Sequence, residues 1–536
     1  MTNKGSAGPI RRALAEWSGS PLTWLGLLVT LTLLLPLGGV VAAALVPGEA
    51  AIAPREVARY AATTAGLVVL VAGIAGGLGA IAAWLVALHR FPGRGLFSWA
   101  LALPLAAPAF AVAYGYADLL DVAGPVQTGL RAQFGFDLPL RLRSLWGAAF
   151  VLGLAFYPYT YLTLRAALES QAAQAVEAAR TLGAGPWRAF SAVALPMAWP
   201  AVAAGLSLTV METLADYGAV KFLSVQTLTT GVVRAWSVYG SPGAAARFAL
   251  PLLGAAALLI WIERTTRGRR QFAAAGGQRP FQPIHLTGAA AFGASLFCTL
   301  LFVFALLLPA AWLAISALQI EPQWSRLIPA AVRTVTLGTA GAVATVGLAV
   351  LLALTLPRLG PVARSVSLGY ATPGAVMAIG LLAPAAVVWS LVPGAAAGFG
   401  WGLALLIYAY AARLAAAALE PVEAGLDRAG PAMVGAARLL GRSEAGAAFG
   451  VRLPVARGAV FTALLIVFVD VLKELPATLI LRPFDFDTLA VLASNYAQDE
   501  RLAQAGPPSL MIILLALPGV VWLSRRMSDP RRESST

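Results

Sequence analysis

The sequence predicts an all-α, polytopic membrane protein with about twelve transmembrane helices, arranged as two parallel six-helix repeats. The first observation is composition: of 536 residues, 59% are hydrophobic and only 12% are charged, whereas soluble domains carry about 25% charged residues. The second is a mean hydropathy of +0.79, with apolar runs longer than the ~18 residues that mark a membrane span. The third is an internal repeat with a constant offset. Together these observations exclude a soluble protein.

Six apolar runs, bounded by charged residues or by Pro and Gly clusters, predict the spans of each half. In the first half they are Trp24–Val46, Ala61–Leu88, Leu96–Leu120, Leu145–Leu164, Met197–Val220 and Phe248–Ile262. In the second half they are Leu286–Ala317, Val335–Leu356, Val366–Leu391, Trp401–Ala418, Ala459–Ile480 and Ser509–Leu523. Basic residues precede the first run, as in a signal peptide, but its apolar stretch exceeds the usual ~7–15 residues. We therefore expect it to be a span.

An excess of positive charge, 38 Lys and Arg against 24 Asp and Glu, sets the expected orientation. Twelve spans place both termini and every second loop on one side of the membrane. That side, which includes the loop assigned from Arg413 through Arg457, holds 25 basic residues; the opposite loops hold 12, and Lys473 lies inside a span. Because cytoplasmic loops are rich in Lys and Arg, both termini are predicted to be cytoplasmic. No nucleic-acid partner is needed to explain the net charge.

The residue inventory disfavours several kinds of site. The single cysteine, Cys298, excludes an intrachain disulfide and a cysteine metal cage, and two histidines, His89 and His285, are too few for a histidine site. None of the three lysines is followed by Ser or Thr, as a phosphate-binding P-loop requires. We therefore expect no cofactor on this chain, no ATP hydrolysis by it and no enzyme activity.

An internal repeat is visible in one loop of each half. The first copy reads Glu177-Ala178-Ala179-Arg180-Thr181-Leu182-Gly183, then nine residues, then Val193-Ala194-Leu195-Pro196. The second reads Gly435-Ala436-Ala437-Arg438-Leu439-Leu440-Gly441, then nine residues, then Val451-Arg452-Leu453-Pro454. The two copies are offset by 258 residues. Because each repeat contains an even number of spans, the two repeats are predicted to be parallel.

The same offset extends into the following span and beyond it. It places Glu212 and Asp216 opposite Asp470 and Glu474, and Thr230 opposite Thr488. Farther upstream the offset becomes 265 and pairs Pro108 with Pro373, because the loop at residues 121–143 is longer than its counterpart. Loops absorb such insertions, whereas spans do not.

These motifs resemble the E-A-A-x3-G-x9-I-x-L-P signature of permease subunits of ABC importers, with Val in place of Ile in both copies. The residues around Asp216 and Glu474 resemble the ferric iron branch of that family. The resemblance covers the whole chain and implies a type I ABC importer permease, with repeats at 1–280 and 281–536. It also implies two cytoplasmic ATPase subunits that hydrolyse ATP, a periplasmic solute-binding protein and the bacterial inner membrane. Gly435 departs from the signature, which has Glu there.

A short, rigid helix in each of these two loops suits the transmission of force from an ATPase. Ala178, Ala179 and Leu182 share one helical face that fits a partner's groove, and Glu177 is placed to pair with a basic residue there. Gly183 permits a positive φ at the helix end. Leu195-Pro196 and Leu453-Pro454 are predicted to mark the start of the next span, because proline is tolerated in a first helical turn. The alternative is an ordinary amphipathic connector.

Two acid pairs fall inside predicted spans, where a carboxylate costs about 2.5–3.5 kcal/mol near the bilayer centre. Glu212 and Asp216, and likewise Asp470 and Glu474, are spaced i, i+4 and share a helix face. One interpretation is a buried charge network with Lys473 that holds the two halves together. The other is a translocation path for a hard cation, to which the carboxylates and Tyr217 offer oxygen ligands. The residues leave both interpretations open, and the identity of any metal unknown.

The function predicted from the resemblance is an ABC importer permease, with ferric iron as its solute. Thiamine, sulfate, molybdate, phosphonate and polyamine permeases share the loop pattern, so these solutes remain alternatives. A gradient-driven secondary transporter is a further alternative, because such carriers also contain parallel repeats. The paired loops argue against it, since a carrier driven by an ion gradient needs no docking sites for an ATPase.

Overall fold

The computed structural model describes residues 21–46, 52–136, 141–169, 178–179, 181–268, 283–359, 361–391 and 399–528, and this part of the chain is almost entirely helical. It contains ten helices long and apolar enough to cross a membrane, or twelve when each of two bent helix pairs counts as one span. The prediction of an all-α membrane protein with about twelve spans is thus confirmed. The described strands, β1 (His89–Arg90) and β2 (Ile284–His285), are two residues each and pair in parallel.

The helices of the first half are α2 (Pro21–Ala44), α3 (Pro54–Leu88), α4 (Arg94–Ala100), η1 (Leu103–Ala106), α5 (Ala109–Leu120), α6 (Pro125–Phe134), α7 (Leu145–Ala167), α9 (Pro186–Ala189), η3 (Phe190–Ala194), α10 (Leu195–Met197), α11 (Trp199–Ala215), α12 (Gly218–Phe222), α13 (Leu228–Ser237) and α14 (Pro242–Gly268). Those of the second half are α15 (Gly288–Phe302), η4 (Val303–Leu307), α16 (Leu308–Leu318), α17 (Trp324–Leu359), α18 (Pro361–Arg364), α19 (Ser367–Ala371), α20 (Gly374–Leu391), α21 (Phe399–Asp427), α22 (Pro431–Leu439), α23 (Glu444–Ala447), η6 (Ala448–Arg452), α24 (Leu453–Leu472), α25 (Pro476–Leu481), α26 (Leu489–Gln498) and α27 (Leu502–Ser528).

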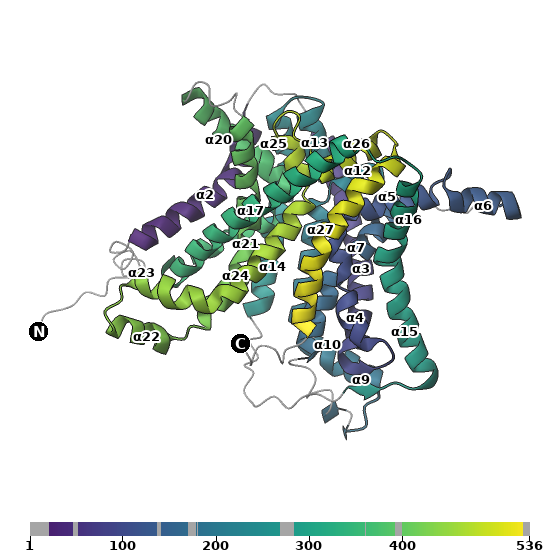
Figure 1. Ribbon diagram of the computed structural model, residues 1–536, viewed down its shortest axis with the longest axis horizontal. Coiled ribbons are helices and arrows are strands. Elements are labelled where there is room, and N and C mark those ends of the chain that lie inside the picture. Colours follow the sequence, from purple (N-terminus) through teal and green to yellow (C-terminus); the bar gives the residue numbers. More distant parts are fainter. Residues whose placement is uncertain are drawn as a thin grey trace, which may run out of the picture.

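The two ends of the bundle carry different elements. The short helices α9, α10, α22 and α23 lie at one end, and α13, α25 and α26 lie at the other (Figure 1). Helix α2 begins and α27 ends on the side of α9 and α22 (Figure 1). The repeated loops therefore share one side of the molecule, as parallel repeats require.

The predicted spans Leu96–Leu120 and Val366–Leu391 are not single helices. Each is interrupted by an extended residue that precedes a proline: Ala107, with φ −91° and ψ 125°, and Thr372, with φ −89° and ψ 129°. The proline ring disfavours the helical conformation of the residue before it. The breaks fall at the Pro108 and Pro373 that the 265-residue offset relates, so the structure shows the same interruption in both repeats.

The predicted spans Met197–Val220 and Ala459–Ile480 also end earlier than expected. Helix α11 stops at Ala215, because Asp216 is extended with ψ 131°, and α24 stops at Leu472. A short helix follows each break, α12 in the first repeat and α25 in the second. Irregular backbone at membrane depth is tolerated where it is enclosed by protein or lines a cavity.

The predicted equivalence of Thr230 and Thr488 is wrong. Thr488 is the N-cap of α26, whereas the N-cap of α13 is Thr227. The hydroxyls of Thr64 and Thr334 accept hydrogen bonds from the first N–H groups of α13 and α26, at 2.9 and 2.8 Å. Thr227 is therefore the counterpart of Thr488. The 258-residue offset fails here because the second repeat has a longer connection after its short helix.

The first span of each half packs against the other half. Helix α2 lies along α20 and α17 of the second half, and α16 lies along α5 of the first half as well as α27 of its own. Figure 1 shows the purple α2 beside the green helices of the second half. At the first crossing, Gly39 and Gly380 bring two backbones together with no room for a Cβ atom on either. At the second, a Cβ on Gly115 would lie 2.7 Å from the carbonyl oxygen of Pro309. The two halves are therefore interlocked.

Candidate functional site

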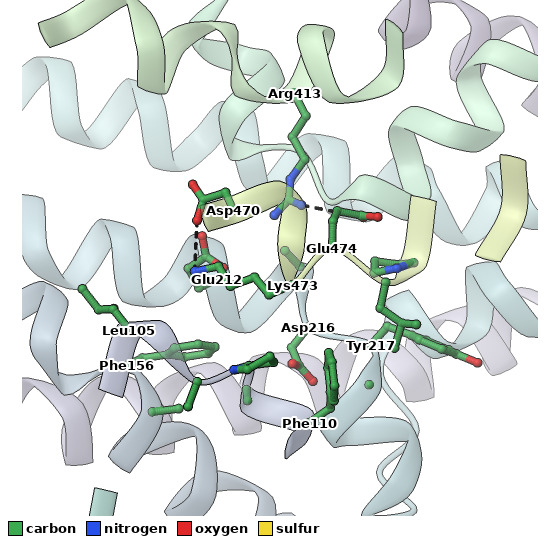
Figure 2. A pocket seen from close by; sticks show the side chains of 18 of the residues that line it. Leu105, Phe110, Phe156, Glu212, Asp216, Tyr217, Arg413, Asp470, Lys473 and Glu474 are labelled. Carbon is green, nitrogen blue, oxygen red and sulfur yellow. Dashed lines mark ion pairs between the residues drawn. The ribbon is translucent and has the colours of Figure 1, made fainter. Parts of the chain in front are cut away.

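A cavity lies between the two repeats and is lined by all six residues predicted for the translocation path, together with Arg413. We call it the chamber (Figure 2). Its charged lining consists of four carboxylates and two cations, a formal charge of −2: Glu212, Asp216, Asp470, Glu474, Arg413 and Lys473. The apolar part of its lining includes Phe110, Phe156 and Leu105.

Asp216 and Glu474 act as helix caps, which the sequence reasoning did not predict. Asp216 Oδ1 accepts a hydrogen bond from the N–H of Val220 in α12, at 3.0 Å. Glu474 accepts from the N–H groups of Ala477 and Thr478 in α25, at 3.0 and 3.1 Å. Each carboxylate thus satisfies free N–H groups at the start of a short helix and faces its positive end.

The ion pairs of the chamber lie within the second repeat. Lys473 Nζ is 3.0 Å from Asp470 Oδ1, and Arg413 Nη1 is 3.8 Å from Glu474 Oε1. Both pairs are drawn in Figure 2. Among the described residues that line the chamber, no ion pair crosses from one repeat to the other. Attraction between the repeats comes instead from Lys473 and Arg413 of the second repeat acting on Glu212 of the first, as the charge-network interpretation expects.

Glu212 and Tyr217 differ in their surroundings. Tyr217 is buried and forms the N-cap of α12. The Glu212 carboxylate is attracted electrostatically by Lys473 and Arg413, but within the described residues it has neither a side-chain hydrogen bond nor an ion pair. The described residues also contain no group of three or more His, Cys, Asp or Glu side chains that could hold a metal ion. The four carboxylates line a space without converging on one point.

Arg413 is the functional candidate that sequence reasoning missed. It was counted with the basic residues of a cytoplasmic loop, but it lies inside α21, with only 13% of its side chain exposed. The guanidinium points into the chamber toward Glu474 (Figure 2). Its place within the predicted span Trp401–Ala418 was the available signal, because a charge inside a span marks a functional candidate.

A second cavity adjoins the chamber. The two cavities share Leu105, Tyr159, Asp470 and Lys473 in their linings. The second cavity extends between α21, α24 and α27 as far as Arg428 and Arg526, toward the end of the bundle that carries the repeated loops. We call it the vestibule. The Asp470–Lys473 ion pair therefore lies where the chamber and the vestibule meet.

In the first repeated loop, Glu177 lies outside the described residues, while Ala178 and Ala179 are helical. Gly183 has φ 88°, as its predicted role at a helix end requires. The N–H of Ala184 donates to the carbonyl of Ala179 at 3.0 Å, which is the hydrogen bond expected where a left-handed residue ends a helix. Leu182 is 88% exposed, so this loop presents an apolar side chain to its surroundings.

The second repeated loop has the same geometry. Gly435, Ala436 and Ala437 lie in α22, and Gly441 follows it with φ 81°. The N–H of Arg442 donates to the carbonyl of Ala437 at 3.1 Å, as Ala184 does in the first copy. Leu439 and Leu440 are 91% and 84% exposed. The loops thus offer two related apolar surfaces at one end of the bundle.

The Leu-Pro positions begin the next span in one repeat only. In the second repeat, Leu453 and Pro454 open α24, as predicted, within a continuous stretch Ala445–Leu472. In the first repeat, Leu195 and Pro196 belong to α10, and the chain bends by 73° before α11. The physical reason is Pro200, which lacks an N–H group and follows the bend; its counterpart in the second repeat is Gly458. Five-residue π-helical segments, η3 and η6, precede the motif in both repeats.

An ion-pair network joins the repeats at the opposite end of the bundle. Arg143 donates two hydrogen bonds to the carboxylate of Glu500, at 2.7 and 2.8 Å, and one to Asp121, at 3.0 Å. Its guanidinium also lies 5.0 Å from the ring of Phe222. The hydrogen bonds from Arg143 lower the pKa of Glu500.

Comparison with known proteins finds the same family model in both halves of the chain. The model, described as binding-protein-dependent transport system inner membrane component, matches residues 75–264 and 360–528. An Fe(3+)-transport system permease protein of Haemophilus influenzae is 26% identical over 455 residues, 82% of this chain and 84% of the relative. A sulfate transport system permease protein of Escherichia coli is 32% identical over 173 residues, 32% of this chain and 60% of the relative. A molybdenum transport system permease protein of Escherichia coli is 30% identical over 197 residues, 35% of this chain and 85% of the relative.

Proposed function

Because the chain belongs to the family of binding-protein-dependent transport system inner membrane components, we propose that it is the fused permease subunit of an ABC importer for ferric iron. The family and the apolar helices establish a multi-pass permease of the inner membrane that carries the permease unit twice. The proposal adds the identity of the solute, the individual partners and the side of the membrane on which the two termini lie.

The observation that carries the choice of solute is the formal charge of −2 in the chamber, where four carboxylates face two cations. Helices α11 and α24 also have their C-terminal ends at the chamber. The C-terminal end of a helix is negative and favours a cation. Ferric iron is a hard cation that prefers oxygen ligands. The relative that aligns over most of both chains is named for Fe(3+) transport, whereas the sulfate and molybdenum relatives align with about a third of this chain.

A tetrahedral oxyanion is the second candidate solute. Arg413 and Lys473 are the observation that favours it, because an oxyanion needs cationic donors, and relatives named for sulfate and molybdenum transport belong to the same comparison. Both cations, however, are already paired with carboxylates of their own repeat. An oxyanion would have to break these pairs and would also face Glu212.

In the proposed mechanism, an external binding protein delivers the solute to the chamber, which opens through the vestibule on the cytoplasmic side. Two cytoplasmic ATPase subunits dock on the repeated loops, one on the surface around Leu182 and one on the surface around Leu439 and Leu440. This arrangement places the termini in the cytoplasm. Each loop is joined to its membrane helix, α11 or α24, through a π-helical segment, so movement of the loop acts directly on the helices that end at the chamber.

The test is uptake in proteoliposomes that contain the chain, its partner ATPases and its binding protein loaded with radioactive ferric iron. We expect uptake that requires ATP hydrolysis. Glu212→Gln together with Asp216→Asn should lower uptake more than it lowers the folded yield; an equal loss of both would indicate a structural role. ATP-driven uptake of sulfate or molybdate in place of iron would refute the proposed solute. Uptake by the chain alone, driven by an ion gradient, would refute an ABC importer.

A further inference from the structure

The two repeats contribute unequally to the charge of the chamber. The 258-residue offset pairs Glu212 with Asp470 and Asp216 with Glu474, so each repeat supplies two acids. The same offset pairs Arg413 with Ala155 and Lys473 with Ala215, and both alanines line the chamber. The acids are therefore duplicated, but both cations come from the second repeat.

The unequal distribution places both ion pairs of the chamber in the second repeat. In the second repeat, Asp470 faces Lys473 at 3.0 Å and Glu474 faces Arg413 at 3.8 Å. Each of these acids thus already holds a cationic group that belongs to the chain. In the first repeat, the alanines offer no such group, and within the described residues neither Glu212 nor Asp216 has an ion pair. The cations that attract Glu212, Lys473 and Arg413, belong to the second repeat and are already paired there.

The second repeat also shows how a cation is held on this backbone. Lys473 follows Asp470 by three residues, just as Ala215 follows Glu212. Both positions lie at the end of the long helix, where Lys473 is the C-cap of α24 and Ala215 is the last residue of α11. The negative end of each helix supports a cation at this place, and a carboxylate enclosed by protein is unfavourable without one.

We propose that Lys473 and Arg413 are built-in counter-ions that occupy the second repeat's half of the chamber, so that the transported cation is held on the first repeat's half alone, at Glu212 and Asp216. Ala155 and Ala215 then determine specificity, because their small side chains leave this half without a competing charge. The proposal rests on the proposed function, since it requires a cationic solute. The chamber then binds one cation at a time, although each repeat supplies a pair of carboxylates.

The decisive variant is Ala215→Lys, which gives the first repeat the counter-ion that Lys473 gives the second. Its control is Ala215→Met, which adds a side chain of similar length without the charge. In proteoliposomes with the ATPases and the iron-loaded binding protein, Ala215→Lys should lower the uptake of ferric iron at least tenfold. Because Ala215→Met also fills chamber space, the comparison is between the two variants: Ala215→Lys should transport at least fivefold less ferric iron than Ala215→Met. Both variants should retain ATP hydrolysis in the absence of solute.

A double variant tests whether the charge itself is responsible. Ala215→Lys combined with Lys473→Ala moves the lysine from the second repeat to the first. Glu212 then has a lysine partner, and Asp470 has lost its own and is available to the transported cation. We expect it to restore uptake at least threefold over Ala215→Lys alone. A general disturbance of folding would give the double variant no advantage, and equal uptake by the single and double variants would refute the proposal.

A variant modified after folding covers the case in which Ala215→Lys does not fold. Ala215→Cys is treated with 2-aminoethyl methanethiosulfonate, which attaches a positive charge through a disulfide, or with the methyl reagent, which attaches a neutral group; the native Cys298 is buried. Only the charged reagent should block iron uptake. Equal effects of the two reagents in a chain that transports iron would refute this inference but not the proposed function. A wild-type chain that transports sulfate and not iron would refute the proposed function itself.

Discussion

Asp216 and Glu474 each accept a hydrogen bond from the backbone N–H four residues along the chain, Val220 at 3.0 Å and Thr478 at 3.1 Å. The two residues are equivalent in the repeats, and each caps the short helix that follows a broken span. They differ in their other contacts: Glu474 also accepts from the N–H of Ala477 and from the hydroxyl of Thr478, and it faces the guanidinium of Arg413.

This difference predicts unequal losses of stability on removal of the two carboxylates. Asp216→Ala removes a cap, which lowers the free energy of unfolding by about 1 kcal/mol. Glu474→Ala removes a cap and leaves the buried Arg413 without its partner, a change that costs about 3–5 kcal/mol. Thermal unfolding of the two variants in detergent should therefore show the larger fall in melting temperature for Glu474→Ala. Equal falls would contradict the assigned Arg413–Glu474 pair.

The crossing of α2 and α20 predicts a sharp contrast between neighbouring glycines. Gly39→Ala places a methyl group against the carbonyl of Gly380, whereas a Cβ on Gly38 meets nothing within 4 Å. Overpacking of this kind costs about 1–3 kcal/mol. We expect Gly39→Ala to reduce the folded yield and the melting temperature, and Gly38→Ala to leave both unchanged. The comparison is made by gel filtration and thermal unfolding, and a stable Gly39→Ala variant would argue against the close crossing.

The glycines that end the repeated loop helices predict a defect in coupling. Gly183 and Gly441 have φ of 88° and 81°, a conformation that costs a residue with a side chain roughly 1–2 kcal/mol. Alanine at either position should lower ATP-driven uptake while the folded yield stays near that of wild type. Gly347→Ala is the control, because Gly347 lies within α17, outside the repeated loops, and a Cβ there meets nothing within 4 Å. If all three variants transport alike, the loop ends do not contribute to coupling.

The pair formed by Arg143 and Glu500 predicts a dependence of stability on pH. Hydrogen bonds from Arg143 lower the pKa of Glu500 below its ordinary value of 4.5. A lowered carboxylate pKa stabilises the folded protein above the ordinary value, and this contribution is lost as the pH falls through the folded value. The difference in melting temperature between wild type and Glu500→Gln should thus be small but present at pH 7, since exposed pairs contribute about 0–1 kcal/mol, and should vanish in acid.

The control for this measurement is Asp499→Asn, which changes a neighbouring acid outside the Arg143 network. It should follow the wild-type melting temperature across the same pH range. A difference for Glu500→Gln that persists unchanged at pH 3 would mean that the loss comes from packing and not from the charge.

Much of this architecture could be predicted because it depends on local sequence. Long apolar runs indicated the spans, and the offset of 258 residues brought the acid pairs into register, so that all six predicted path residues line one chamber. The breaks in the spans were not predicted, since a hydropathy window averages over a single extended residue such as Ala107 or Thr372. Pro108 and Pro373 were the available signals, because each restricts the residue before it.

Other features depend on contacts between distant parts of the chain. No local pattern indicates that Gly39 will meet Gly380, because the requirement for glycine comes from a neighbouring backbone. Arg413 was misplaced because its charge was counted by loop, although its sequence position lies within a span. The pairing of Thr230 with Thr488 failed because an offset carried through a loop of variable length no longer identifies structural counterparts.

The interlocked first helices have a consequence for how the protein is made. Helix α2 is synthesised before α20, the helix against which it packs. The roughly 340 residues between Gly39 and Gly380 take about 20–70 s to translate at 5–20 residues per second. During that interval the face of α2 that carries Gly39 lacks its partner helix and contacts lipid. The fusion of the halves ensures that the awaited helix arrives on the same ribosome, so the interlock closes without a search for a separate partner.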